Sequence, residues 1–130
     1  MTIYNLEILA ATWNRLDIQL LEPRISEKFS YESQFVFKQI LSKAEFVSHL
    51  ETKFQAIRLL QDEGIMSVNA QIGFHPSVNM RPCIILSQTV SEHIEKVLLF
   101  IDEVDDLISS INVCFIPNPD TAILSGIQPK

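Results

Sequence analysis

Residues 42–64, SKAEFVSHLETKFQAIRLLQDEG, predict one long amphipathic helix with a start signal and a stop signal. Ser42 and Glu45 have the spacing of a capping box, in which each side chain accepts a free backbone N–H of the first turn. Gly64 stands where helices often end in the left-handed conformation. Apolar residues recur at steps of three and four and form one stripe, consisting of Phe46, Leu50, Phe54, Ile57 and Leu60. This stripe needs a broad apolar surface to pack against.

The rest of the chain divides into helices before this segment and strands mainly after it. Residues 2–16 predict a first helix with an apolar face made of Leu6, Leu9, Trp13 and Leu16. Residues 18–25 predict a short second helix capped by Asp17, with Pro23 near its first turn or at a kink. Alternating or continuous apolar runs predict strands at 28–33, 34–40, 66–74, 83–89, 93–101 and 107–116.

The connections between these elements complete the predicted fold. The acidic segment 102–106 predicts a turn between the last two strands, and the segment 75–82 predicts a loop. Residues 117–130 contain three of the six prolines and predict an irregular tail. Helices that are segregated from strands indicate an α+β fold, with the helices on one face of a curved antiparallel sheet. The 130 residues suffice for one domain, so we expect a single domain over 1–130.

Composition and charge argue against several classes of protein. The formal net charge is −6 and the ten Lys and Arg residues are scattered, whereas nucleic-acid binding needs a clustered basic face. No apolar run approaches the length of a membrane span, and the first residues lack the basic segment of a signal peptide. Cys83 and Cys114 lie in separate apolar strands, and we interpret them as reduced core residues of a cytoplasmic protein rather than a disulfide.

Three strand segments, CIIL, VLLFI and VCFI, are apolar on both faces, unlike an antiparallel sheet with one face in water. The helices can cover only one face, so either Leu98 and Phe100 or Leu99 and Ile101 would be exposed. Contiguous exposed apolar patches are uncommon on soluble monomers. We therefore expect a homodimer through the outer face of the sheet, with its two-fold axis near Cys114 or its neighbours Asn112 and Ile116.

Three segments in this order resemble the nuclear-transport-factor-2-like superfamily, which includes SnoaL-like (polyketide-cyclase-like) proteins. They are AATWNRLDIQLLEPRISEKFSYES at 10–33, KAEFVSHLETKF at 43–54 and LLFIDEVDDLISSINV at 98–113. The resemblance covers most of residues 4–116. It implies a cone-shaped, strongly bent antiparallel sheet wrapped around three N-terminal helices, a dimer, and a pocket for a small, largely apolar molecule. It does not imply a reaction, because one fold supports many functions.

Reactions of this superfamily need side chains that the sequence lacks at the matching positions. Its steroid isomerases use a tyrosine on the first helix and two carboxylic acids. A gapless match places Leu9 at the tyrosine and Ser33 at the proton-shuttling acid, and the late-strand acid falls near Val97. Its epoxide hydrolases need an Asp–Arg–Asp set on inner strand faces, and the last three predicted strands contain no Arg. The resemblance therefore implies a pocket without either chemistry.

Candidate ligand contacts are the polar and aromatic residues that could face this pocket. Trp13 lies in the stripe of the first helix, where its ring packs in the core or lines the pocket floor. Tyr31 either points its hydroxyl inward from the first strand or is a surface tyrosine. Polar residues inside apolar strands complete the set, because pockets combine apolar walls with a few polar groups. The predicted pocket lining is Trp13, Tyr31, Phe37, Asn69, Gln88 and Asn112.

The three histidines do not indicate a metal site. His49 lies four residues from both Glu45 and Lys53, a spacing typical of a solvated helix face. His75 lies in a predicted loop at the rim of a strand and His93 at the start of another, with no spacing that suits metal ligands. We predict neither a metal nor a cofactor.

Three functions stay open at this point. The first is a small-molecule-binding domain without chemistry of its own. The second is an isomerase, cyclase or hydrolase that acts on a small apolar substrate through Tyr31 and His75 or another rim group. The third is a structural or interaction module that uses the sheet surface. A deep cavity favours the first two, and an inward acid or histidine hydrogen-bonded to a second polar group favours the enzyme.

Overall fold

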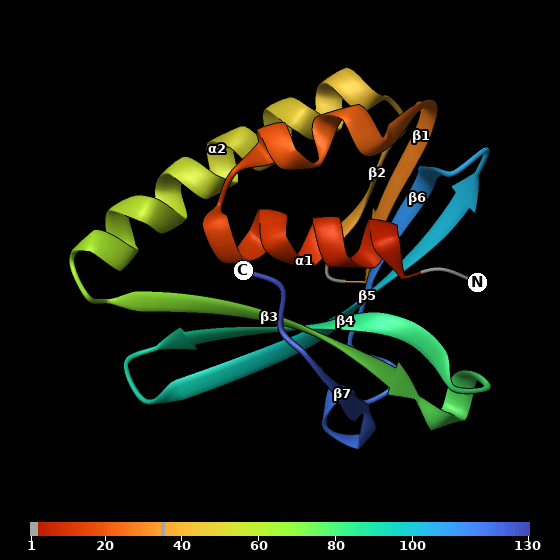
Figure 1. The fold of residues 1–130 in the computed structure, drawn as a ribbon. Coiled ribbons are helices and arrows are strands. Elements are labelled where there is room, and N and C mark those ends of the chain that lie inside the picture. The colour runs from red at the N-terminus through yellow and green to blue at the C-terminus, as the bar shows by residue number, and fades with distance from the viewer. Residues whose placement is uncertain (1–2, 35) are drawn as a thin grey trace.

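The computed structural model describes residues 3–34 and 36–130, without the side chains of residues 36–38. Two α-helices and a seven-stranded sheet make up this described part (Figure 1). The helices are α1 (Tyr4–Arg15) and α2 (Lys43–Asp62). The strands are β1 (Ile25–Ser33), β2 (Val36–Ile40), β3 (Met66–His75), β4 (Arg81–Val90), β5 (His93–Val104), β6 (Leu107–Cys114) and β7 (Ile123–Ile127). This arrangement confirms the α+β fold class. No helix in the described residues has the length and apolar character that crossing a membrane requires.

The sheet is mixed, with the strand order β2-β1-β6-β5-β4-β3-β7. Strand β1 pairs with β6 in parallel, and the other neighbouring pairs are antiparallel. The prediction of a wholly antiparallel sheet was therefore wrong for one pair. The cause is α2, which carries the chain back along the sheet before β3 begins, so that β6 later meets β1 in the same direction (Figure 1).

Helix α2 has the predicted ends. The Ser42 hydroxyl accepts the backbone N–H of Glu45 at 3.1 Å, and Gly64 has a left-handed φ of 72°. The four apolar residues Phe46, Leu50, Phe54 and Ile57 are buried. Leu60 is 38% exposed, so its assignment to the buried stripe was wrong. Figure 1 shows the reason, because the last turns of α2 extend past the end of α1.

The second predicted helix, at 18–25, is instead two 3-10 turns, η1 (Ile18–Leu20) and η2 (Glu22–Arg24). Pro23 lies in the first turn of η2. An α-helix through 18–25 would lose a hydrogen bond there, because proline has no backbone N–H. Asp17 does act as a cap, since its carboxylate accepts the Gln19 N–H at 3.0 Å.

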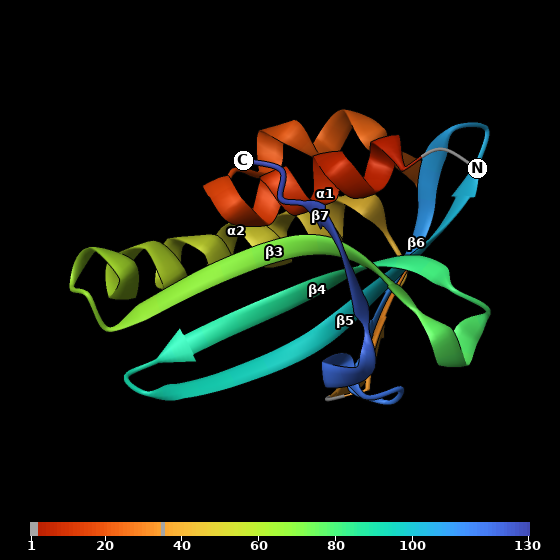
Figure 2. The same ribbon diagram turned by 60° about the horizontal axis from the view of Figure 1, so that its bottom comes forward.

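Helix α1 lies between α2 and β3 and packs against both. Trp13 contacts Phe54 edge-to-face, with ring centroids 5.0 Å apart. On the other side, the Asn14 side chain accepts the Ala70 backbone N–H at 2.7 Å and donates to the Ala70 carbonyl at 3.0 Å. Helix α1 packs on both α2 and β3, which also contact each other directly, and both helices lie on the same face of the sheet (Figure 2).

Part of the outer face of the sheet is covered by the chain itself. Leu98 is 0% and Phe100 is 5% exposed, and both belong to a second apolar cluster with Cys83 and Ile85. Val78 and Ala122 pack against this cluster from outside the sheet. The expectation that either Leu98 and Phe100 or Leu99 and Ile101 would lie in water was therefore wrong, because Leu99 is 2% exposed and Ile101 is partly buried. Dimerisation through this face stays a prediction, but it is no longer supported by exposed Leu98 and Phe100 side chains.

The predicted irregular tail contains the seventh strand. Strand β7 pairs with β3, where Gly73 permits a close approach because a Cβ would lie 2.6 Å from the Ile123 carbonyl oxygen. His75, predicted as a loop residue at a strand rim, is only 2% exposed and anchors the tail. Its Nδ1 accepts the Ser77 N–H at 3.2 Å, so its Nε2 carries the proton donated to the Asn118 carbonyl at 2.8 Å.

Both cysteines lie in or against the outer cluster. Cys83 is buried, Cys114 is half-buried, and both are free thiols. Burial raises the pKa of the Cys83 thiol to about 11. The predicted turn at 102–106 is shorter than expected, because β5 continues to Val104 and the reversal needs only Asp105 and Asp106, both with positive φ.

Phe54→Ala should lower the free energy of unfolding by about 3–5 kcal/mol, the usual cost of truncating a buried Phe. The side chain is 3% exposed and supports Trp13, so the change leaves a cavity between two helices. Denaturant titration measures the loss. Leu59→Ala on the same helix is the control, because Leu59 is 67% exposed and its loss should cost less than about 0.5 kcal/mol. Equal effects of the two changes would contradict this packing.

Candidate functional site

A cavity of about 900 Å³ lies between α2 and the inner face of the sheet. The sheet supplies an apolar wall from β2, β3, β4, β5 and β6. Its apolar side chains are Ile40, Val68, Leu86, Val97, Leu99 and Val113. Helix α2 supplies the opposite wall, which is mainly polar. The volume falls within the range of pockets that hold small organic ligands.

The α2 wall is a helix face next to the buried stripe. Residues of this face recur at steps of three and four along α2, so they share one side of the helix. They are Glu45, Ser48, His49, Thr52, Lys53 and Ala56. The buried stripe holds α2 against α1 and β1, and the neighbouring face is consequently turned toward the cavity.

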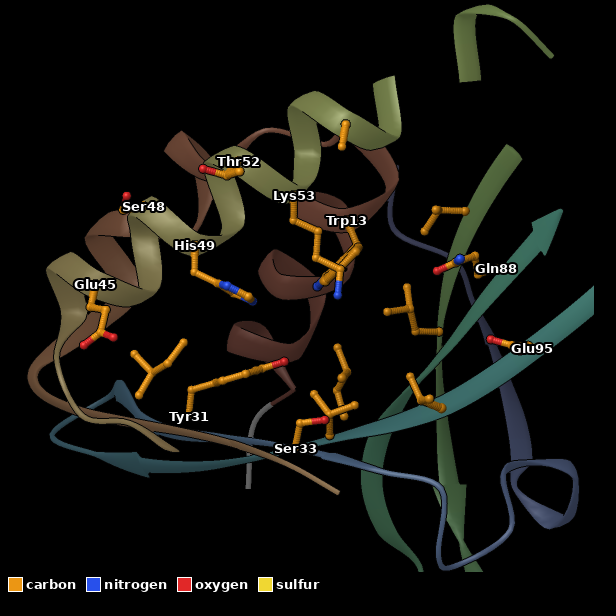
Figure 3. A pocket seen from close by; sticks show the side chains of 17 residues that line it. Trp13, Tyr31, Ser33, Glu45, Ser48, His49, Thr52, Lys53, Gln88 and Glu95 are labelled. Carbon is orange, nitrogen blue, oxygen red and sulfur yellow. The ribbon is translucent and has the colours of Figure 1, made fainter. Parts of the chain in front are cut away.

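Four side chains with hydrogen-bond donors point into the same part of the cavity: Trp13, Tyr31, His49 and Lys53 (Figure 3). The Tyr31 and His49 rings have centroids 5.9 Å apart. The Lys53 Nζ lies 5.8 Å from the centre of the Trp13 ring, within range of a cation–π interaction. His49 and Lys53 are exposed side chains, but the surface that they expose belongs to the cavity.

The protein around the cavity changes the pKa values of these groups. Desolvation lowers the pKa of Lys53 because the cavity walls displace water from its amine. Desolvation also lowers the pKa of His49, and the nearby charge of Lys53 lowers it further, whereas Glu45 acts in the opposite direction. Burial raises the pKa of the Tyr31 phenol. Near neutral pH the imidazole of His49 is therefore neutral and Tyr31 keeps its proton.

The predicted pocket residues separate into three groups. Trp13, Tyr31 and Gln88 line the cavity. Asn69 does not, because it lies on the other side of β3 from Val68 and accepts a hydrogen bond from the Gln128 side chain. Asn112 does not line it either, because Val113, the next residue on β6, faces inward. The Phe37 side chain lies outside the described residues.

Two residues interpreted as solvated, His49 and Lys53, line the cavity instead. The i, i+4 charge pattern was correct for an exposed helix face, but it does not distinguish bulk water from a water-accessible cavity. A usable signal was the position of this face, one step around the helix from the buried stripe. Among the described residues, no three His, Cys, Asp or Glu side chains are grouped as a metal ion would need.

The statement that the last three predicted strands contain no Arg also needs a correction. Strand β4 begins at Arg81, two residues earlier than predicted. Its guanidinium lies over the Phe100 ring on the outer face and donates to the Ile101 carbonyl at 2.6 Å and to Asp102 at 3.1 Å. Arg81 is therefore not part of the cavity lining.

The lowered pKa of Lys53 predicts a pH-dependent contribution to stability. An unfolded chain has a lysine pKa of about 10.4 and the folded chain holds it lower, so the unfolded chain binds more protons between the two values. Enclosing the ammonium therefore costs free energy at neutral pH, and this cost falls as the pH rises through that window. The free energy of unfolding of the wild type, relative to that of Lys53→Met, should rise from about pH 7 to about pH 10.

Denaturant titrations of both proteins at each pH measure this difference. Lys96→Met is the matched control for losing a lysine, because Lys96 lies on the opposite face of β5 and pairs with Asp120 at 3.3 Å. A difference between wild type and Lys53→Met that stays constant or falls with rising pH would show that the cavity does not depress this pKa.

Solved structures share this fold at low sequence identity. A nuclear-transport-factor-2-like protein of unknown function from Cytophaga hutchinsonii has a TM-score of 0.61 at 12% identity, over 92% of this chain and 94% of that chain. A steroid delta-isomerase from Pseudomonas aeruginosa has a TM-score of 0.62 at 17% identity, over 85% and 76%. An LEH-like epoxide hydrolase from Mycobacterium tuberculosis has a TM-score of 0.57 at 12% identity, over 85% and 79%.

No protein-family model and no curated protein matches the sequence. The identities to the solved structures are low enough that the similarity concerns the fold alone. Within that limit, the resemblance noted from the sequence is confirmed: the chain has the α+β fold of the nuclear-transport-factor-2-like superfamily.

Proposed function

We propose that the protein binds a small, largely apolar molecule in the cavity between α2 and the sheet, without catalysing a reaction on it. The observation that carries this proposal is the cavity itself, which combines a continuous apolar wall with a few polar groups that point into one region. Known ligand pockets have this composition, because apolar contact supplies affinity and polar groups set orientation.

The chemistry of the lining supports binding over catalysis. Two of the three positions that the superfamily resemblance assigns to isomerase groups, Ser33 and Val97, do line the cavity. Neither residue is an acid, so the cavity lacks those acids at the matching positions. Leu9, at the third position, is 1% exposed and lies in the core.

An isomerase, cyclase or hydrolase is the alternative, with Tyr31 and His49 as an acid–base pair. Their rings are close enough to act on one substrate. A general base normally forms a hydrogen bond with a second group that orients it. In the described part of the chain, no hydrogen bond joins His49 to another side chain, which favours the binding function. His75, the other catalytic candidate, anchors the tail outside the cavity.

Ala56→Phe tests the proposed function by filling the cavity. Ala56 lines the cavity from an exposed helix face, so a phenyl ring there occupies ligand space without overpacking the core. The neutral dye N-phenyl-naphthylamine should bind the wild type with increased emission, and its affinity should fall about tenfold or more in the variant, the loss of about 1.4 kcal/mol of contact. Fluorescence titration measures both.

Ala44→Phe is the matched control, because it places the same ring on the same helix outside the cavity. It should bind the dye like the wild type. Native mass spectrometry of the purified wild type should also reveal a co-purified small molecule, which Ala56→Phe would lack. Absence of dye binding to the wild type, or equal binding to both variants, would refute a ligand site in this cavity.

A further inference from the structure

The inner part of the cavity presents hydrogen-bond donors that have no hydrogen-bond partner among the described residues. Within the described residues, no hydrogen bond or ion pair is formed by the Lys53 ammonium, the Tyr31 hydroxyl or the Trp13 indole N–H. Their known contacts are with rings. All three side chains, together with His49, point toward the same space (Figure 3). A ligand that forms hydrogen bonds with these donors must supply acceptor atoms.

The carboxylates of the lining lie at the edges of this space rather than at its centre. Glu45 and Glu95 lie at opposite ends of the lining, on either side of Lys53 (Figure 3). The Glu95 carboxylate already contacts His93 at 3.3 Å. Glu45 is in the first turn of α2, where the helix dipole stabilises an acid. Among the ion pairs between described residues, none joins Lys53 to either acid.

The charge of Lys53 is the strongest constraint on the ligand. When an apolar ligand displaces water from the cavity, the Lys53 ammonium loses hydration and needs an opposite charge to offset that loss. The Trp13 ring face provides only a weak electrostatic substitute. A neutral carbonyl or hydroxyl would satisfy Tyr31, but it would leave the ammonium without a counter-charge.

The same residues argue against a phosphate. A phosphate carries up to two negative charges and is normally bound by arginine forks or by several backbone N–H groups at a helix start. No arginine is found among the described lining residues, and Lys53 lies in the middle of α2. One cation and one or two neutral donors match a group with a single negative charge and two acceptor atoms.

We propose that the cavity selects small apolar carboxylic acids, with Lys53 and Tyr31 binding the carboxylate and the sheet wall binding the apolar body. The inference rests on the proposed function and names the class of its ligand. Val68, Leu86, Val97 and Leu99 lie across the cavity from α2, so the apolar body extends from the carboxylate over the inner face of β3, β4 and β5. The neutral His49 imidazole can add one further hydrogen bond.

The experiment compares three molecules with the same ten-carbon body: decanoate, decanol and decylamine. Isothermal titration calorimetry gives the affinities. The emission of Trp13, the only tryptophan of the chain, reports binding at the cavity. The wild type should bind decanoate about tenfold or more tightly than decanol, because a hydrogen bond to a charged group is worth at least that factor. Decylamine should bind most weakly, because its ammonium would lie beside Lys53.

Four variants separate the causes. Lys53→Met should remove the preference for decanoate and leave the affinity for decanol nearly unchanged. Lys53→Arg should retain the preference, because the positive charge stays. Tyr31→Phe should lower the affinity for decanoate severalfold, because one hydrogen bond to the carboxylate is lost. Lys96→Met, on the opposite face of β5, is the control for the loss of one positive charge and should behave like the wild type.

The outcomes distinguish this inference from the proposed function. If decanol and the neutral dye bind but decanoate has no advantage, the carboxylate assignment is wrong and the binding function stands. The same holds if Lys53→Met keeps the full preference for decanoate. If neither the dye nor any of the three molecules binds to the wild type, the proposed function fails, and the assignment of its ligand fails with it.

Discussion

The contact between Trp13 on α1 and Phe54 on α2 is the interaction on which the remaining structure depends. It holds α2 against α1, and α1 in turn is attached to β3 through the Asn14 side chain. Because α1 packs between part of α2 and β3, only part of the long helix contacts β3 directly. At the other end, Phe46 packs on Phe29 of β1 with centroids 4.7 Å apart. Between these two supports a space remains under α2, and the cavity is that space.

Features governed by neighbouring residues were readable in the sequence. The Ser42 cap and the Gly64 exit depend on contacts within a few positions, and both have the predicted geometry. Features governed by distant segments were not readable. The parallel pairing of β1 with β6 depends on the direction in which α2 returns the chain. The cluster that buries Leu98 includes contacts from Val78 and Ala122, which lie in segments that the sequence predicted as a loop and an irregular tail.

The candidate site shows the same division. Trp13, Tyr31 and Gln88 could be found because an aromatic or polar residue in an apolar element often faces a pocket. Asn69 and Asn112 satisfied the same rule but lie on the other face of their strands, and strand alternation assigns faces only when the inner face is known. Lys53 and His49 could not be found from their spacing alone, because that spacing is also typical of an ordinary solvated helix face.

Lys53 is therefore the residue at which local rules and the structure disagree most. The Lys53 ammonium is partly desolvated and has no ion-pair partner among the described residues, which disfavours its charged form. A leucine or methionine at this position would extend the apolar lining and avoid a desolvated charge. Sequences that specify one fold have few such conflicts, and those that remain concentrate at functional sites. Lys53 lies at the centre of the donor groups in the cavity, and a bound anion would explain why a lysine is found there.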